Sequence, residues 1–185
     1  MSNLSFLTGA SLELTLALVK PDAVEAGHLG SIISEMEKHF LVGDVVSTTW
    51  PAAFAGFFYE EHVGKPYYSD LVSFMSSGRL CMVALVAPNA VEKWRTMMGA
   101  TDPMKAEFGT IRNRFAPMDG VIMHNAVHGS DSIESVGREL GRIRKQLYVR
   151  PDRGELCFPT FGEEAHKLIE KYKNKKWTLS GRVFV

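Results

Sequence analysis

The sequence predicts an α+β fold, a ferredoxin-like sandwich in which helices pack on one face of a four-stranded, mainly antiparallel sheet. Four apolar or β-rich segments alternate with segments of helical periodicity, and this split βαβ order is typical of such a sandwich. The 185 residues are 45% hydrophobic, which suffices for one substantial core and disfavours two domains. We therefore expect one main domain over residues 1–147, with its core from about residue 12, and a C-terminal extension over residues 148–185.

The first strand and the first helix are expected between residues 12 and 40. The run from Leu12 to Val19 is rich in β-forming residues and ends at Lys20-Pro21-Asp22, where proline stops the strand and predicts a loop. Apolar residues then recur at helical spacing and predict a helix that packs on the sheet or on another helix. These residues are Leu29, Ile32, Ile33, Met36 and Phe40.

Two further strands are expected in the middle of the chain. The segment from Leu41 to Trp50 returns to strand composition, and Leu80 to Val86 is a continuous apolar strand. Between them, Pro51 to Ser77 predicts short helices interrupted by Gly64-Lys65-Pro66. After them, Asn89 to Met98 predicts a helix with Asn89 as its N-cap.

The last core elements follow a long polar segment. Residues 99–120 lose all periodicity and gather Gly, Pro and polar residues, which predicts a long loop of the functional kind. Val121 to Val127 is a fourth apolar segment and the expected fourth strand. Ser130 or Asp131 should then cap a helix, because Asp131 and Glu134 have capping-box spacing. The expected buried face of this helix comprises Ile133, Val136, Leu140, Ile143 and Leu147.

The extension predicts one more helix, over residues 162–173, with acidic residues first and lysines last. That polarity suits the helix dipole. Because the extension keeps several aromatic and aliphatic residues, it is too apolar for a free linker. We expect it to pack on the body or on a neighbouring subunit.

Composition argues against several classes of function. Lys plus Arg and Asp plus Glu both number 21, so no global charge attracts nucleic acid or an anionic membrane, and nucleic-acid binding is not expected. No apolar stretch reaches the roughly 18–20 residues of a membrane span, so no membrane insertion is expected. The two cysteines predict neither a disulfide scaffold nor a zinc site. A cytoplasmic location is expected, with mitochondrial import left open.

One histidine is the leading candidate for covalent chemistry. His128 lies between the expected fourth strand and the next helix, and Glu139 falls on the inward side of that helix. An unpaired buried carboxylate is costly, so Glu139 needs a polar partner, and His128 is a reasonable one. A carboxylate that orients a histidine raises its basicity and fixes its tautomer.

Five segments resemble successive signatures of the nucleoside diphosphate kinase family, in the family's order. They are ALVKPDAV (17–24), KPYYSDLVSFMSSG (65–78), WRTMMGATDP (94–103), TIRNRF (110–115) and NAVHGSDSIES (125–135). The resemblance implies a ferredoxin-like core and ping-pong transfer of phosphate between nucleoside triphosphates and diphosphates through a phosphohistidine. It also implies Mg²⁺ carried on the nucleotide and a homo-oligomer, first a hexamer and otherwise a tetramer or dimer.

The resemblance further implies roles for single residues. His128 would be the nucleophile, with its ring held by Glu139 and Ser130. Asp131 would be at most an outer-sphere contact of Mg²⁺, with no direct metal ligand in the protein. His62 lies at a position that varies in the family. The substrate-binding residues implied are Lys20 and Asn125 at the ribose 3′-hydroxyl and phosphates, Tyr59 beside the transferred phosphate, Tyr67 on the base, and Arg95, Thr101 and Arg112 on the phosphates.

Phosphoryl transfer requires such residue types in any case, because arginines and a lysine stabilise the charge spread over the phosphate oxygens. The sequence lacks both a GxxxxGK[ST] loop and the motifs of protein kinases. It also departs from the common family pattern: Tyr67 replaces a phenylalanine, Asn113-Arg114 replaces a Gly-Asp pair, and the stretch from Phe115 to Asn125 is longer. The alternative is a binding or scaffold protein that keeps the fold with weak or partner-dependent activity.

Overall fold

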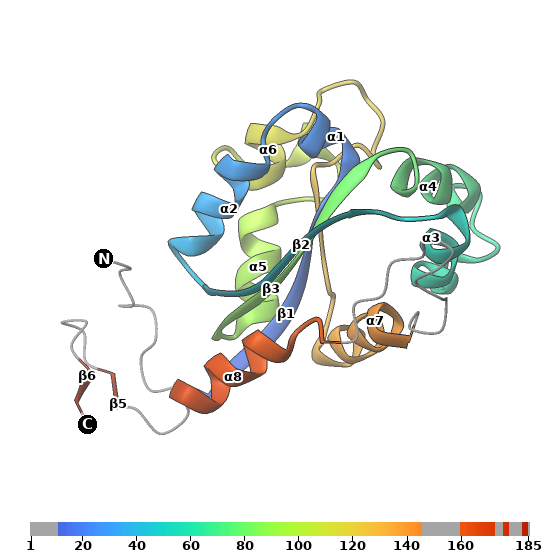
Figure 1. The fold of residues 1–185 in the computed structure, drawn as a ribbon. Helices are drawn as coiled ribbons and strands as arrows, with labels where there is room; N and C mark the ends of the chain where they lie inside the picture. Colours follow the sequence, from blue (N-terminus) through green and yellow to red (C-terminus); the bar gives the residue numbers. More distant parts are fainter. Residues whose placement is uncertain (1–10, 146–159, 173–175, 178–182, 185) are drawn as a thin grey trace.

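The computed structural model describes residues 11–145, 160–172, 176–177 and 183–184. Within them, a four-stranded sheet has the order β2-β3-β1-β4, and every neighbouring pair is antiparallel (Figure 1). The predicted α+β sandwich with an antiparallel sheet is therefore confirmed. The strands are β1 (Leu12–Val19), β2 (Leu41–Thr49), β3 (Arg79–Pro88) and β4 (Val127–Gly129).

Helices cover both faces of this sheet, so the expectation of a single covered face was wrong. In β3, Leu80, Met82 and Ala84 point into one hydrophobic cluster, whereas Cys81 and Val83 point into the other. A strand buried on both faces is apolar at every position, which explains the unbroken apolar run in β3. The helices of the first cluster are α3 (Ala52–Phe58), α4 (Tyr68–Met75), α7 (Ile133–Lys145) and α8 (Glu163–Tyr172). Those of the second are α1 (Pro21–Glu25), α2 (Leu29–Glu37), α5 (Ala90–Met98) and α6 (Ile111–Phe115).

Three local predictions need correction. Pro21 ends β1 as expected, but it starts helix α1 at once instead of a loop, since proline suits the first helical position. Asn89 does precede α5, yet its backbone is left-handed with φ 50° and its side chain makes no capping hydrogen bond. The long polar segment contains α6 and a 3₁₀ turn, η2 (Pro103–Lys105), both too short to give a periodic pattern.

The fourth strand lies later than predicted. Val121 and Ile122 are 40% and 56% exposed and belong to a loop, and pairing with β1 begins only at Val127. Between them, Ala126 has φ 63°, which is incompatible with an extended strand. Apolar composition alone did not distinguish a strand from a loop at this point.

Helix α7 begins with a reciprocal cap one residue later than expected. The Ser132 hydroxyl accepts the N–H of Ser135 at 3.2 Å, and the Ser135 hydroxyl accepts the N–H of Ser132 at 2.8 Å. Ile133 is 62% exposed, contrary to expectation. The other predicted core positions of this helix are buried at Val136, Leu140 and Ile143, and Leu147 lies outside the described residues.

The helix predicted in the extension is present as α8, and it packs against β2. Ala165 is fully buried, and the backbones come so close that a Cβ on Gly43 would lie 2.9 Å from the Ala165 nitrogen. The domain boundary itself stays a prediction, because residues 146–159 lie outside the described part of the chain. Two short segments, β5 (Lys176–Trp177) and β6 (Val183–Phe184), pair antiparallel in a second sheet. A 3₁₀ turn, η1 (Glu60–His62), lies between α3 and α4.

Candidate active site

A cleft of about 740 Å³ collects residues from distant parts of the chain. Every predicted site residue except Ser130 lines it, as do His62 and Asp131. The walls come from the residue after β1, the η1 turn, α4, α5, α6, the loop before β4, β4 with the residues that follow it, and α7. The predicted residues that line it are Lys20, Tyr59, Tyr67, Arg95, Thr101, Arg112, Asn125, His128 and Glu139.

His128 is the central residue of β4 and pairs with Leu18 of β1. Its backbone carbonyl accepts a hydrogen bond from the indole N–H of Trp94 at 3.2 Å. Gly129 is required beside it, because a Cβ there would collide with the Trp94 ring. The imidazole packs edge-on against Tyr59, with ring centroids 5.7 Å apart, and its side chain is 19% exposed. The ring is therefore held firmly while part of it reaches the cleft.

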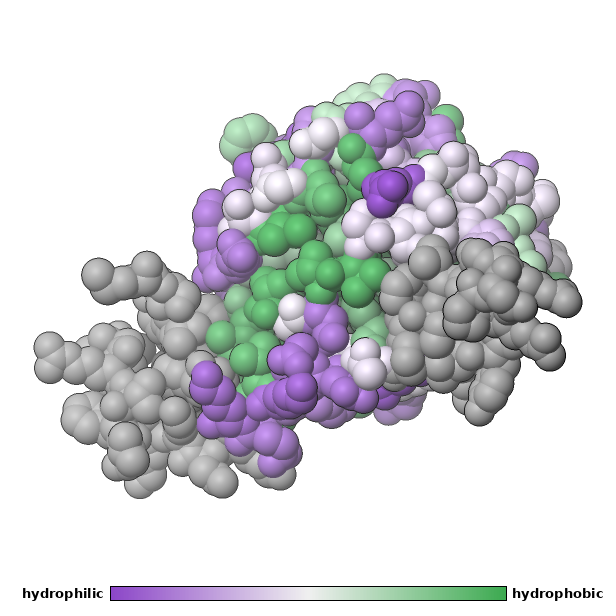
Figure 2. Space-filling model, viewed as in Figure 1, coloured by the Kyte–Doolittle hydropathy of each residue, from purple (hydrophilic) through white to green (hydrophobic). Residues whose placement is uncertain are grey.

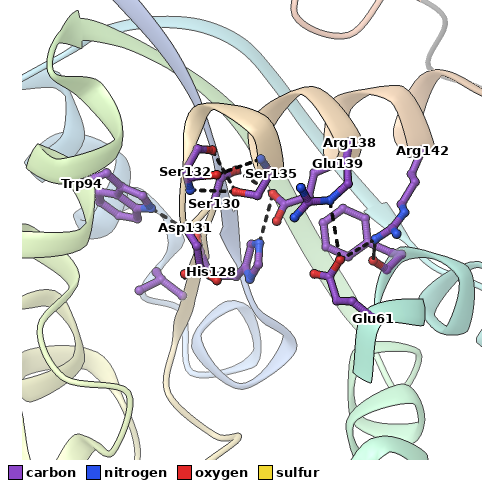
Figure 3. A network of polar contacts seen from close by, with 12 residues as sticks. Glu61, Trp94, His128, Ser130, Asp131, Ser132, Ser135, Arg138, Glu139 and Arg142 are labelled. Carbon is purple, nitrogen blue, oxygen red and sulfur yellow. Dashed lines mark hydrogen bonds and ion pairs between the residues drawn. The ribbon is translucent and has the colours of Figure 1, made fainter. Parts of the chain in front are cut away.

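Glu139 and Ser130 lie behind the imidazole (Figure 3). Nε2 of His128 lies 3.3 Å from Oε2 of Glu139, and the Ser130 hydroxyl donates to the same oxygen at 2.6 Å. The Glu139 side chain is only 4% exposed. Burial opposes its ionisation, but the nearby His128 imidazole and the hydrogen bond from Ser130 outweigh burial and lower the pKa of Glu139. An ionised carboxylate thus faces Nε2.

Lys20 follows the last residue of β1 and is buried at the wall of the cleft. Its ammonium donates to Oδ1 of Asn125 at 2.7 Å and to the carbonyl of Met123 at 3.1 Å. Burial lowers the pKa of Lys20 to about 7, a shift that Asp22 opposes and Arg112 reinforces. The Asn125 amide in turn donates to the carbonyl of Thr101 at 2.9 Å, so the structure connects Lys20, Asn125 and Thr101 in one chain of hydrogen bonds.

The two arginines of the cleft differ in their surroundings. Arg112 is only 7% exposed, and its guanidinium donates to the carbonyls of Gly99 at 2.9 Å and of Val127 at 3.1 Å. Burial, followed by the charge of Arg95, lowers the pKa of Arg112 to about 10. Arg95 is half exposed and pairs with the exposed carboxylate of Asp131. Arg112 therefore also braces the backbone of the site, whereas Arg95 is free to exchange Asp131 for another anion.

Two tyrosines occupy different environments in the cleft. Tyr59 is buried, and its hydroxyl has no hydrogen-bond partner among the described residues. Burial, together with the charges of Glu139 and Glu61, raises the pKa of Tyr59, so its hydroxyl stays a neutral donor. Tyr67 is 45% exposed, and its hydroxyl lies 3.2 Å from Nδ1 of His62.

Arg142 of α7 is a site-forming residue that the sequence did not reveal. It is buried, and its guanidinium bonds the Phe58 carbonyl at 2.7 Å, Glu61 at 3.1 Å and Glu60 at 2.6 Å. These contacts fasten the segment that carries Tyr59 to the helix that carries Glu139 (Figure 3). The sequence offered one indication of this role: Arg142 follows Glu139 by three residues, so the two side chains are neighbours on the surface of the same helix.

The described part of the chain offers neither a cluster of metal-binding side chains nor a membrane-spanning helix. No group of three or more His, Cys, Asp or Glu side chains there is arranged to hold a metal ion. None of the helices in those ranges is long and apolar enough to cross a membrane.

Comparisons with known proteins agree with one another. The family model for nucleoside diphosphate kinase matches residues 13–146. The nucleoside diphosphate kinase of Syntrophotalea carbinolica is 44% identical over 131 residues, which cover 70% of this chain and 93% of that protein. Nucleoside diphosphate kinase 1 of Protochlamydia amoebophila is 45% identical over 141 residues, covering 76% of this chain and 94% of that protein.

A solved structure shows the same likeness. An orthorhombic crystal form of the Aquifex aeolicus nucleoside diphosphate kinase superposes with a TM-score of 0.67 at 35% identity, covering 71% of this chain and 94% of that one. The matched region contains β1 except its first residue, β2 to β4 and the whole cleft. The chain therefore belongs to the nucleoside diphosphate kinase family.

Proposed function

We propose that this chain is a nucleoside diphosphate kinase that passes the terminal phosphate of a nucleoside triphosphate to a nucleoside diphosphate through His128. One observation carries the proposal: a partly exposed imidazole reaches a cation-lined cleft while a buried, ionised carboxylate holds its Nε2. The family membership of the chain supports the same reaction.

In the first half-reaction, the lone pair of Nδ1 of His128 attacks the γ-phosphorus. A P–N bond forms, the bond to the bridging oxygen breaks, and the diphosphate leaves with the bonding electrons. Since Nε2 faces Glu139, Nδ1 is the nitrogen left for this attack, and Glu139 balances the positive charge on the phosphorylated ring. In the second half-reaction, a terminal oxygen of a different diphosphate attacks phosphorus and releases neutral His128.

The cleft residues would stabilise this transfer by position and charge. Lys20 and Asn125, already bonded to each other, would meet the ribose hydroxyl and the phosphates. Arg95 would leave Asp131 for the phosphate oxygens. The unpartnered Tyr59 hydroxyl is suited to donate to the transferred phosphate, and Tyr67 offers a π-face to the base. The remaining donors of Arg112 and the exposed Thr101 would complete the phosphate contacts.

Mg²⁺ fits this site as an ion carried by the nucleotide. Three acidic residues line the cleft, but Glu61 is paired with Arg142 and Glu139 with Ser130. Only the third, Asp131, exposes its carboxylate at 81%, so it would contact the ion through water. When bound, Mg²⁺ would neutralise part of the phosphate charge.

We further propose that the protein is a homo-oligomer, with a hexamer as the first candidate. Strand β2 is an edge of the sheet, and Val45 on it is 46% exposed. Figure 2 shows apolar side chains gathered in the middle of this face of the molecule, where β2 passes above α8 in Figure 1. An exposed apolar sheet edge favours association with a second chain. A cytoplasmic location stays a prediction.

The reaction is tested by incubating the protein with γ-labelled ATP, followed by treatment of the labelled chain with acid or alkali. A phosphohistidine loses its label in acid and keeps it in alkali, and addition of GDP should then release the label as GTP. A wild-type chain that takes up no label, even after addition of a partner extract, would favour the scaffold alternative.

Replacing Glu139 with glutamine should slow the phosphorylation of His128 without abolishing it. The amide keeps the size of the side chain but loses the charge that supports the ring, and outer contacts of this kind are worth about ten- to a hundredfold. Rapid-quench labelling should show a slower burst of undiminished amplitude and nearly unchanged nucleotide affinity. The exposed Glu134 on the same helix provides the matched control, Glu134→Gln. Labelling of Glu139→Gln at the wild-type rate would make Glu139 a purely structural residue.

A further inference from the structure

The backbone makes an unusual turn just before the strand that carries His128. Ala126 is fully buried and has φ 63°, although it is not glycine. The N–H of Val127 bonds the carbonyl of Asn125 at 2.7 Å, which closes a three-residue γ-turn with Ala126 at its centre. This form of the γ-turn is rare and strained, because a positive φ brings the alanine Cβ too close to the following carbonyl oxygen. Surrounding contacts must therefore hold the turn in place.

The N–H and the carbonyl of Ala126 are both hydrogen-bonded by residues at the junction of β1 and α1. Oδ2 of Asp22 accepts the N–H of Ala126 at 2.9 Å. The carbonyl of Ala126 accepts the N–H of Lys20 at 2.8 Å. Asp22 is 104 residues away in sequence, so only the tertiary fold brings this acceptor to the strained turn.

The turn separates two groups that act on different parts of the substrate. On one side, Asn125 bonds the Lys20 ammonium at 2.7 Å. On the other side, Val127 begins β4 and His128 follows it. A change in the Ala126 conformation would therefore alter the distance between Asn125 and the imidazole, and a misplacement of about 1 Å can cost a hundredfold in rate.

We infer that Asp22 is a positioning residue of the phosphotransfer site, which fixes Asn125 relative to His128 by holding the γ-turn at Ala126. This inference rests on the proposed function. Asp22 does not line the cleft, and its hydrogen bond acts on the backbone that joins Asn125 to His128, while its charge also opposes the burial that lowers the pKa of Lys20. A simpler role is an acidic residue in the first turn of α1, where it would favour the helix dipole. That role needs no contact with Ala126, so the two roles predict different mutant behaviour.

The test compares Asp22→Ala, Asp22→Asn and Glu25→Ala by rapid-quench labelling with γ-labelled ATP, normalised to folded protein. Asp22→Ala should slow the labelling burst at saturating nucleotide about ten- to a hundredfold, with a smaller change in nucleotide affinity. Asp22→Asn keeps an oxygen acceptor for the Ala126 N–H and should label clearly faster than Asp22→Ala, while loss of the charge beside Lys20 keeps it below the wild-type rate. Glu25 is an exposed acid on the same short helix, and its replacement should change nothing.

A second variant pair tests the turn directly. Glycine adopts positive φ without strain, so Ala126→Gly alone should stay within about threefold of the wild type, and in combination it should partly rescue Asp22→Ala. Labelling by Asp22→Ala at the wild-type rate, or Asp22→Asn as slow as Asp22→Ala, would overturn the inference, as would a double variant with no rescue. A wild-type chain that takes up no label would instead contradict the proposed function.

Discussion

Replacement of His128 by alanine is expected to abolish both covalent labelling and phosphate transfer while leaving the fold intact. The imidazole is the proposed carrier of the phosphate, so no other group can complete either half-reaction. The contacts that place this residue are mainly backbone ones: β4 pairs with β1, and Trp94 donates to the His128 carbonyl. Both survive the substitution. Nucleotide binding should persist, because Lys20, Arg95 and Arg112 remain.

Incubation with γ-labelled ATP measures the loss of covalent labelling, and phosphate exchange between ATP and GDP measures the loss of transfer. His39→Ala is the matched control, since His39 is an exposed histidine at the end of α2, away from the residues that line the cleft. Equal thermal unfolding of the two variants would show that folding is preserved. Label retained by His128→Ala would place the covalent intermediate on another residue and remove the basis of the proposed mechanism.

The elements that were predicted well are those with long, regular patterns. β1 and the body of β3 stand out through continuous apolar or β-branched sequence, and α2 and α7 through helical spacing. The wrong predictions concern segments whose composition does not match the backbone conformation they adopt. Val121 and Ile122 are apolar but belong to an exposed loop, and their composition does not reveal the left-handed turn at Ala126 that ends this loop.

The chemistry of the cleft was easier to anticipate than its supports. His128 and the cations of the cleft could be proposed because their side-chain types match phosphoryl transfer and the family pattern. The contacts of Arg142 with Glu60, or of Asp22 with Ala126, join residues 82 and 104 positions apart. No periodicity encodes such pairs. Likewise, the sequence could not show that Arg112 donates hydrogen bonds to two backbone carbonyls.

Replacing Lys20 with methionine should have the second-largest effect, lowering the transfer rate about 10²- to 10³-fold at neutral pH. Lys20 is buried at the cleft and directed at Asn125, so its loss removes a fixed donor from the region where phosphate charge develops. Methionine keeps much of the apolar stem and cannot carry the charge. Lys38→Met is the control, because Lys38 is an exposed lysine on the surface of α2 that pairs with Glu35.

The pH dependence of the free protein provides an independent signature of Lys20. Its folded-state pKa is about 7 and its ordinary value is 10.5, so between these limits the unfolded chain binds a proton that the folded chain releases. The free energy of unfolding should therefore rise with pH across this window in the wild type, and this rise should be absent from Lys20→Met.

In the folded protein burial favours the neutral amine of Lys20, whereas bound phosphates should favour its charged ammonium form. At pH 8 the wild type should thus take up protons as it binds nucleotide, and its affinity should fall as pH rises above about 7. Calorimetry in two buffers of different ionisation enthalpy measures the uptake. The Lys20→Met variant should take up fewer protons than the wild type and the Lys38→Met control. Equal uptake by all three would mean that another group receives the proton and that Lys20 is already charged before the phosphates arrive.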